Sequence, residues 1–115
     1  MLARLFRFHG HNSVRRSYRQ GSSVRGRIGS LHVYSDARHP HFRVAVVVSK
    51  KVHKSAVVRN RIRRRIYEII RLSQKDLTKP SELVFTIYQV EAATMPHQQL
   101  VKEVQELLKR AKLLH

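Results

Sequence analysis

Basic residues dominate the charge of this chain and constrain how it can fold. Lysine and arginine number 24 among 115 residues, aspartate and glutamate only 7, and the formal net charge is +17. So many like charges repel one another on a compact body, and a surface kept basic for solubility alone needs only roughly 2 to 8 charges. A phosphate backbone would relieve the repulsion and release counterions. We therefore expect a nucleic acid as partner, with an anionic membrane surface as the competing class.

The rest of the composition limits the classes of protein to which this chain can belong. Hydrophobic residues make up 42% of the chain, which is enough for one core, so we expect a single domain over residues 1–115. The sequence contains no cysteine, which excludes disulfides, thiolate zinc sites and a cysteine nucleophile. No apolar run approaches the roughly 18 to 20 residues that span a bilayer, and Arg4 interrupts the start too early for a secretory signal. We expect a soluble, cytoplasmic protein in which residues 1–12 form a flexible arm.

Apolar periodicity and turn residues predict an α+β domain. The expected elements, in chain order, are a short helix over 13–20, two strands within 22–35, a strand over 42–49, a helix over 55–72, a strand over 83–88 and a helix over 97–114 that Thr94 caps. The near-continuous valines of 42–49 indicate burial on both faces, so we expect this strand at the centre of the sheet. The order of elements predicts three helices packed on one small sheet.

The predicted helix over 55–72 has two chemically distinct faces. At about 100° per residue, one stripe collects the large apolar residues that should pack on the sheet: Val58, Ile62, Ile66, Ile69 and Ile70. The opposite stripe and its flank collect mostly guanidinium groups: Asn60, Arg61, Arg63, Arg64, Arg65, Tyr67 and Arg71. A solvated face normally mixes both signs of charge, whereas Glu68 is the one acid in this helix. Because the arginine fork suits phosphate oxygens and stacks on bases, the pattern predicts a nucleic-acid-binding face, which Lys50, Lys51 and Lys54 extend.

The stretch from Val48 to Glu68 resembles the signature of the protein subunit of bacterial ribonuclease P. Three features match that signature at the right spacing: Ser49-Lys50-Lys51, Ala56-Val57, and Arg59-Asn60-Arg61 followed by Arg63-Arg64. The chain departs from the family pattern at three places: Val14 replaces a common aromatic residue, Val52 and His53 stand in the region of a common glycine, and Tyr67 replaces a common arginine. The resemblance extends to the order of elements along most of the chain.

This resemblance implies both a fold and a role. The fold is similar to the second domain of ribosomal protein S5, with a four-stranded sheet and a left-handed βαβ crossover, although right-handed crossovers are the general rule. The role is to join a catalytic RNA and assist endonucleolytic removal of the 5′ leader from precursor transfer RNA, with no protein oligomer required. Together, the signature and the basic face predict binding of the RNA subunit at Ser49, Lys50, Lys51, Lys54, Arg59, Asn60, Arg61, Arg63, Arg64 and Arg71, of which Lys54 and Arg71 come from the charge pattern alone. The resemblance assigns binding of the leader to a cleft between the first helix and the sheet, at Val14, Tyr18 and His32.

The acidic residues do not suggest a catalytic site. They are scattered, without an Asp-x-Asp or Glu-x-x-His pair, so we predict no catalytic residue, no bound metal and no bound cofactor in this chain. The chemistry would belong to the RNA-containing holoenzyme, which requires Mg²⁺. His9 with His11, and His39 with His41, could indicate metal ligands, but surface histidines in a basic protein are the simpler interpretation.

Three alternatives stay open at this point. A structural RNA-binding protein of ribosomal type with the same fold would have no processing role. A protein-only nuclease would cleave RNA with magnesium and without a partner RNA. A membrane-surface protein would use the amphipathic helix over 97–114, although packing on the sheet explains its apolar stripe more simply.

Overall fold

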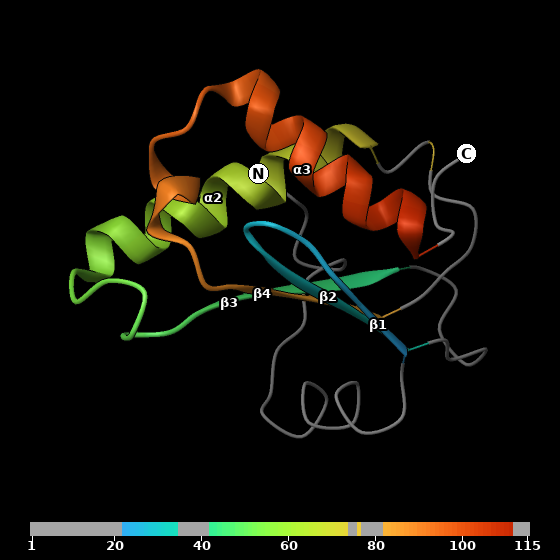
Figure 1. Ribbon diagram of the computed structural model, residues 1–115, viewed down its shortest axis with the longest axis horizontal. Helices are drawn as coiled ribbons and strands as arrows, with labels where there is room; N and C mark the ends of the chain where they lie inside the picture. The colour runs from blue at the N-terminus through green and yellow to red at the C-terminus, as the bar shows by residue number, and fades with distance from the viewer. Residues whose placement is uncertain (1–21, 35–41, 74–75, 77–81, 112–115) are drawn as a thin grey trace.

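The structure is a computed structural model that describes residues 22–34, 42–73, 76 and 82–111. The described elements, in chain order, are β1 (Ser22–Arg25), β2 (Gly29–Tyr34), β3 (Arg43–Val48), α2 (Ala56–Ser73), β4 (Glu82–Ile87), the short 3-10 helix η3 (Val90–Ala93) and α3 (His97–Arg110) (Figure 1). The α+β class is confirmed. The described part of the chain contains two α-helices; the helix expected over 13–20 and the arm expected over 1–12 lie outside the described residues.

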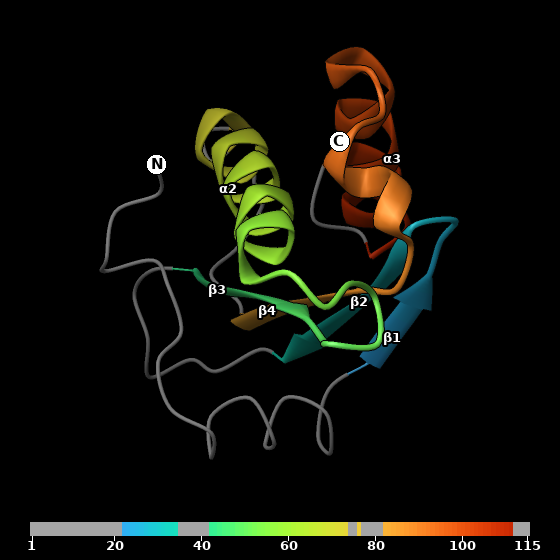
Figure 2. The ribbon, with the colours of Figure 1, turned by 90° about the vertical axis from the view of Figure 1, so that its left-hand side faces the viewer.

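The four strands form one sheet in the order β1-β2-β4-β3. β1 and β2 pair antiparallel, as do β2 and β4, whereas β3 and β4 are parallel. The chain crosses from β3 to its parallel neighbour β4 through α2, which lies over β3, while α3 lies over β1 and β2. Both helices cover the same face of the sheet, so the molecule has a helical layer and a sheet layer (Figure 2).

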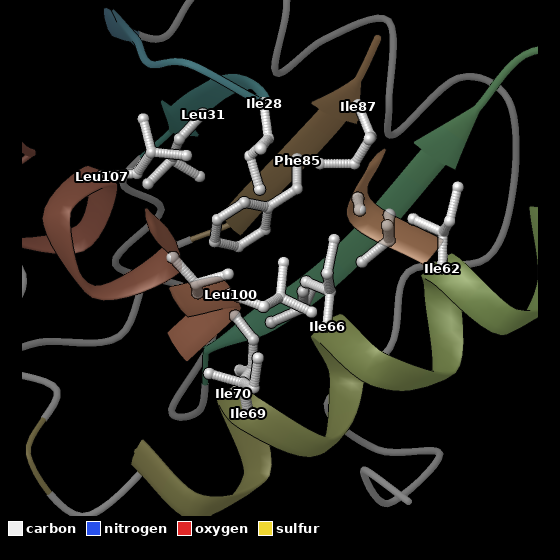
Figure 3. Close-up of a cluster of buried hydrophobic side chains, with 14 of the residues drawn as sticks. Ile28, Leu31, Ile62, Ile66, Ile69, Ile70, Phe85, Ile87, Leu100 and Leu107 are labelled. Carbon is white, nitrogen blue, oxygen red and sulfur yellow. The ribbon is translucent and has the colours of Figure 1, made fainter. Parts of the chain in front are cut away.

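The core lies between these two layers and confirms both apolar stripes. Its large buried side chains from the helices are Ile62, Ile66, Ile69 and Ile70 of α2 and Leu100, Val104, Leu107 and Leu108 of α3. They meet Phe85 of β4 and Leu31 of β2 (Figure 3). Fully burying a side chain of this size contributes about 1.5–3 kcal/mol. Because the apolar stripe of α2 packs on the sheet, the arginines on the far side of the helix, such as Arg61 and Arg64, are exposed to solvent.

The predicted central position of the valine-rich strand is wrong. β3 is the last strand in the sheet order, and β4 is its one partner strand among the described residues. The run of valines is explained by burial of both faces of β3. It does not mean that β3 pairs with a strand along each of its two edges. Val44 and Val46 belong to the main core, while Ala45 and Val84 form a separate small cluster on the opposite face.

Tyr67 covers part of the outer edge of β3, which pairs with no second strand among the described residues. Its hydroxyl oxygen accepts a hydrogen bond from the backbone N–H of Val46, at an N···O distance of 3.2 Å. The ring is half-buried and packs against the core. The helical projection placed Tyr67 among the arginines of the polar face, but its side chain stabilises the sheet edge.

The start of α3 also differs from the prediction. Thr94 ends η3, and α3 begins at His97, directly after Pro96. The proline ring disfavours helical backbone at Met95, the residue before it, so a helix cannot run from Thr94 through Met95. The apolar stripe of α3 is nonetheless buried as expected. No helix in the described ranges is long and apolar enough to cross a membrane.

The close pairing of β2 and β4 predicts a strong effect of one glycine substitution. A Cβ added at Gly29 would lie 2.2 Å from the backbone oxygen of Thr86, which the sheet holds in place. We expect Gly29→Ala to lower the free energy of unfolding by about 1–3 kcal/mol. Gly26→Ala is the matched control, because its Cβ would meet Leu107 Cδ2, the end of a movable side chain, at 2.9 Å. Urea unfolding of both variants tests this, and an equal or larger loss in Gly26→Ala would contradict it.

Candidate nucleic-acid interface

The segment between β3 and α2, residues 49–55, is called the basic loop below. It opens with a turn in which the N–H of Val52 donates to the carbonyl oxygen of Ser49, at 3.1 Å. Ser49, Lys50, Lys51 and Lys54 are all exposed. The loop leads directly into the first turn of α2 (Figure 2), so its lysines and the polar face of α2 are continuous in the chain.

Arg59 and His53 hold the basic loop against the start of α2. The Nη1 group of Arg59 donates to the carbonyl oxygens of His53 and Lys54, at 3.0 and 2.9 Å. The Nδ1 atom of His53 accepts a hydrogen bond from the N–H of Ser55, at 3.0 Å. Arg59 was predicted to bind RNA, and the structure shows that part of its guanidinium is already engaged with the loop.

The arginines on the polar face of α2 differ in whether their side chains already have hydrogen-bond or ion-pair partners. Arg61 and Arg64 are exposed and make no hydrogen bond or ion pair with other described residues. The same is true of the side chains of Lys50, Lys51 and Lys54 within the described ranges. These five side chains are called the free cations below. No acidic side chain among the described residues neutralises their charges.

Two other predicted residues have partners within α2. Arg63 donates from Nη2 to the Oδ1 atom of Asn60. Arg71 donates to Glu68 through Nε, at 3.1 Å from both carboxylate oxygens, and through Nη2, at 2.5 Å from Oε1. These hydrogen bonds from Arg71 are the leading cause that lowers the pKa of Glu68 to about 2, so the pair stays charged at neutral pH.

Arg65 has a structural role that the sequence did not reveal. Its Nη1 and Nη2 groups donate to the carbonyl oxygens of Ala92 and Met95, at 2.9 and 2.6 Å. These two bonds tie α2 to the segment that leads into α3. Partial burial, followed by the nearby charge of Arg61, lowers the pKa of Arg65. The helical projection placed Arg65 on the flank of the polar face because it cannot show which flank of the helix faces another element.

A second candidate surface lies on the sheet face that α2 and α3 leave uncovered. Strand alternation turns Leu31 and Val33 into the core and His32 to the opposite face. A pocket of about 330 Å³ opens there, lined by Ser23, Val24, Arg25, Ser30, His32 and Tyr88. His32 is half-buried, and this burial lowers its pKa. The predicted leader residue His32 is thus part of a pocket, while Val14 and Tyr18 lie outside the described residues.

Arg25 and Tyr88 form one wall of this pocket. The hydroxyl of Tyr88 donates to the carbonyl oxygen of Gly26, at 3.1 Å, and accepts from Nε of Arg25, at 3.2 Å. The guanidinium carbon of Arg25 lies 5.3 Å from the centre of the Tyr88 ring, within the range of a cation–π contact. Neither residue was predicted as part of the site. A signal existed in the alternation of β4, which gives Tyr88 the parity of Thr86. Only the pairing of β2 with both β1 and β4, however, brings Tyr88 to Arg25 and Gly26.

Metal-ligand clusters are absent from the part of the chain that the structure describes: it contains no group of three or more His, Asp or Glu side chains that could hold an ion. The pairs His9 with His11 and His39 with His41 lie outside the described residues.

Comparison with known proteins identifies the family. The family model described as Ribonuclease P matches residues 2–112. The chain belongs to the ribonuclease P protein family. It is 33% identical over 115 residues to the ribonuclease P protein component of Pseudanabaena sp., covering 100% of this chain and 98% of that protein. It is also 33% identical over 113 residues to the ribonuclease P protein component of Symbiobacterium thermophilum, covering 98% and 96%.

Solved ribonuclease P proteins share the fold described above. The RNase P protein of Staphylococcus aureus has a TM-score of 0.85 and 26% sequence identity, covering 96% of this chain and 98% of that one. The RNase P protein of Thermotoga maritima has a TM-score of 0.81 at 19% identity, which shows likeness of fold alone. The arrangement of this ribonuclease P family member is therefore shared across distant sequences.

The different contacts of Arg61 and Arg65 predict different effects of substitution on stability. Arg65→Ala removes two hydrogen bonds from a charged donor, so we expect a loss of about 1.5–3 kcal/mol in the free energy of unfolding. Arg61→Ala removes an exposed charge that has no described partner, and we expect a change within about 0.5 kcal/mol. Urea unfolding at one ionic strength measures both. Equal losses in the two variants would contradict the structural assignment of Arg65.

Proposed function

We propose that this chain acts as the non-catalytic protein subunit of ribonuclease P, and that it binds the catalytic RNA through the basic loop and the polar face of α2. The observation that carries the proposal is the exposure of all five free cations, which lie within the single stretch from Lys50 to Arg64. Like charges placed together repel one another, and a phosphate backbone both relieves this repulsion and releases counterions. Membership of the family supplies the identity of the RNA.

The remaining predicted residues contribute to this surface in different ways. Ser49 lies at the exposed start of the basic loop, where its hydroxyl can reach a phosphate. Asn60 and Arg63 bond to each other and present a paired donor group. Arg71 is paired with Glu68, so a phosphate would compete with a carboxylate there. We therefore propose that Arg71 contributes less than Arg61 or Arg64.

The proposed reaction is hydrolysis of one phosphodiester bond in precursor transfer RNA, which leaves a 5′-phosphate on the mature molecule. Metal ions such as Mg²⁺ activate water and stabilise the leaving oxygen in such reactions. The described residues offer no ligand cluster that fits such an ion, so we derive no step through a metal held by this chain. We propose that the RNA subunit carries the chemistry and that the protein subunit binds and positions RNA.

We further propose that the pocket beside His32 receives part of the 5′ leader. The pocket combines the Arg25 guanidinium, two serine hydroxyls and the ring of Tyr88. Stacking of a base on an aromatic ring is worth roughly 1–3 kcal/mol and tolerates any base, which suits a protein that handles many precursors. Val14 and Tyr18 are included in this proposal only because the family resemblance assigns them to leader binding.

Several finer expectations rest on the resemblance in the same way. They are the likeness to the second domain of ribosomal protein S5, the left-handed crossover through α2 and action without a protein oligomer. A cytoplasmic location is proposed from the sequence pattern instead. The alternative is a structural RNA-binding protein of ribosomal type, which would use the same free cations without processing any precursor.

Reconstitution with ribonuclease P RNA tests the proposed function. At low magnesium, we expect leader removal from precursor transfer RNA to need both the RNA and the protein, because the protein relieves repulsion between the two RNAs. Gel analysis of 5′-labelled precursor measures the cleavage. A protein that leaves the low-magnesium reaction unchanged would favour the ribosomal-type alternative, and cleavage without added RNA would favour a protein nuclease.

Replacing two free cations tests which surface binds the RNA subunit. We expect Arg61→Ala with Arg64→Ala to weaken binding and to reduce the slope of log affinity against log salt by about 0.7 to 0.9 for each lost phosphate contact. Lys102→Ala with Lys109→Ala on α3 is the control, because it removes the same charge from another exposed face. Binding titrations over a salt series measure both, and equal changes in the two double variants would mean that only net charge matters.

Two further substitutions test the leader pocket. We expect Tyr18→Ala and His32→Ala each to weaken the binding of precursor transfer RNA to the holoenzyme while sparing mature transfer RNA, which lacks the leader. The reason is the loss of a stacking or hydrogen-bonding partner for an unpaired nucleotide. Paired titrations with precursor and mature forms measure the difference. Equal weakening of both forms would place these residues outside the leader path.

A further inference from the structure

We propose that His53 is a positioning residue of the RNA-binding surface, whose neutral imidazole holds the basic loop in the conformation that presents its lysines. The inference rests on the proposed function, because it concerns how that surface is organised before RNA arrives. It starts from the hydrogen bond between the Nδ1 atom of His53 and the N–H of Ser55, at 3.0 Å. His53 lies in the region where the family pattern has a glycine, so the pattern does not assign it this role.

The hydrogen bond determines which nitrogen of the ring holds the proton. A backbone N–H can only donate, so the Nδ1 atom that faces Ser55 must offer a lone pair. A neutral imidazole then has its proton on Nε2. A doubly protonated ring would have a donor at Nδ1 and could not make this bond. The geometry therefore requires the neutral Nε2–H form in the loop.

The sequence at the start of α2 explains why this acceptor matters. Ser55 directly precedes α2, and in many helices the N–H at that position bonds to a Glu or Gln side chain three residues later. That residue here is Val58, which has no acceptor. His53 supplies one from two residues upstream, in the same i to i+2 arrangement that an Asn or Asp side chain makes in an Asx-turn. The imidazole thus replaces the missing half of a capping box.

Arg59 completes the restraint from the helix side. Its Nη1 group donates to the carbonyl oxygens of His53 and Lys54, so the side chain of His53 and its backbone are both fixed. Ordering a loop at the moment of binding costs affinity, and a loop that is already ordered avoids that cost. The two restraints therefore favour tight binding by Lys50, Lys51 and Lys54.

The chemistry of histidine suits this place better than that of other acceptors. An aspartate at position 53 could make the same Asx-type bond, but its charge would cancel part of the field of Lys51, Lys54 and Arg59. A neutral imidazole accepts the bond and leaves the positive potential intact. It also leaves its Nε2–H on an exposed residue, away from the bond that orders the loop.

Binding of ribonuclease P RNA by three variants tests the proposal. We expect His53→Ala and His53→Gln to weaken binding about three- to tenfold, the effect of losing one hydrogen bond. We expect His53→Asn to stay within about twofold of the unsubstituted protein, because its side-chain oxygen can restore the i to i+2 bond. His97→Ala, at an exposed histidine that begins α3, is the control and should bind normally.

The salt dependence separates positioning from direct contact. A positioning residue changes affinity but not the number of phosphates neutralised, so the salt slope of His53→Ala should match that of the unsubstituted protein, unlike that of Arg64→Ala. A reduced slope, a failure of His53→Asn to restore binding, or unchanged affinity in His53→Ala would each overturn the proposal.

A measurement without RNA distinguishes failure of the His53 proposal from failure of the proposed function. Nitrogen NMR of the free protein at pH 8 should show His53 with its proton on Nε2, and amide exchange at Ser55 should speed up in His53→Ala and His53→Gln but not in His53→Asn. The Nδ1–H form would overturn the proposal whatever the RNA does. Absence of binding by the unsubstituted protein would instead overturn the proposed function.

Discussion

The packing of one isoleucine stripe against the sheet determines where the charge of this chain can lie. Ile62, Ile66 and Ile70 are fully buried, and the helical period then requires residues on the opposite side of α2, such as Arg61 and Arg64, to face away from the core. A chain with 24 basic and 7 acidic residues cannot neutralise such a face internally. The hydrophobic contact and the cationic surface are therefore two results of the same helix orientation, and a change that rotated α2 would disturb both.

The basic residues around α2 are not equivalent. Arg65 donates hydrogen bonds to the segment before α3, and Arg59 donates hydrogen bonds to the basic loop. Arg61 and Arg64 make no such bonds among the described residues. This division means that a simple count of arginines overstates the number of charges that can meet a partner. It also means that the surface owes its shape to some arginines and its affinity to others.

The features that follow from local periodicity were predictable from the sequence, and those that depend on neighbouring elements were not. The two faces of α2 and the apolar stripe of α3 follow from residue spacing alone. The edge position of β3, the anchoring role of Arg65 and the contact of Tyr67 depend on which element lies alongside, and spacing does not encode that. The capping role expected of Thr94 failed for a local reason, the restriction that Pro96 places on Met95. In the second surface, His32 was predictable through the resemblance, whereas Arg25 and Tyr88 required the strand order.

The contact between Tyr67 and Val46 has a consequence for the protein before it meets RNA. An exposed, valine-rich edge strand is a template on which a strand of another molecule can pair, and this is a common route to aggregation. The Tyr67 hydroxyl occupies one of the backbone donors that such an incoming strand would need. Pairing of another strand with β3 is thereby discouraged by a side chain on the same helix that displays Arg61 and Arg64.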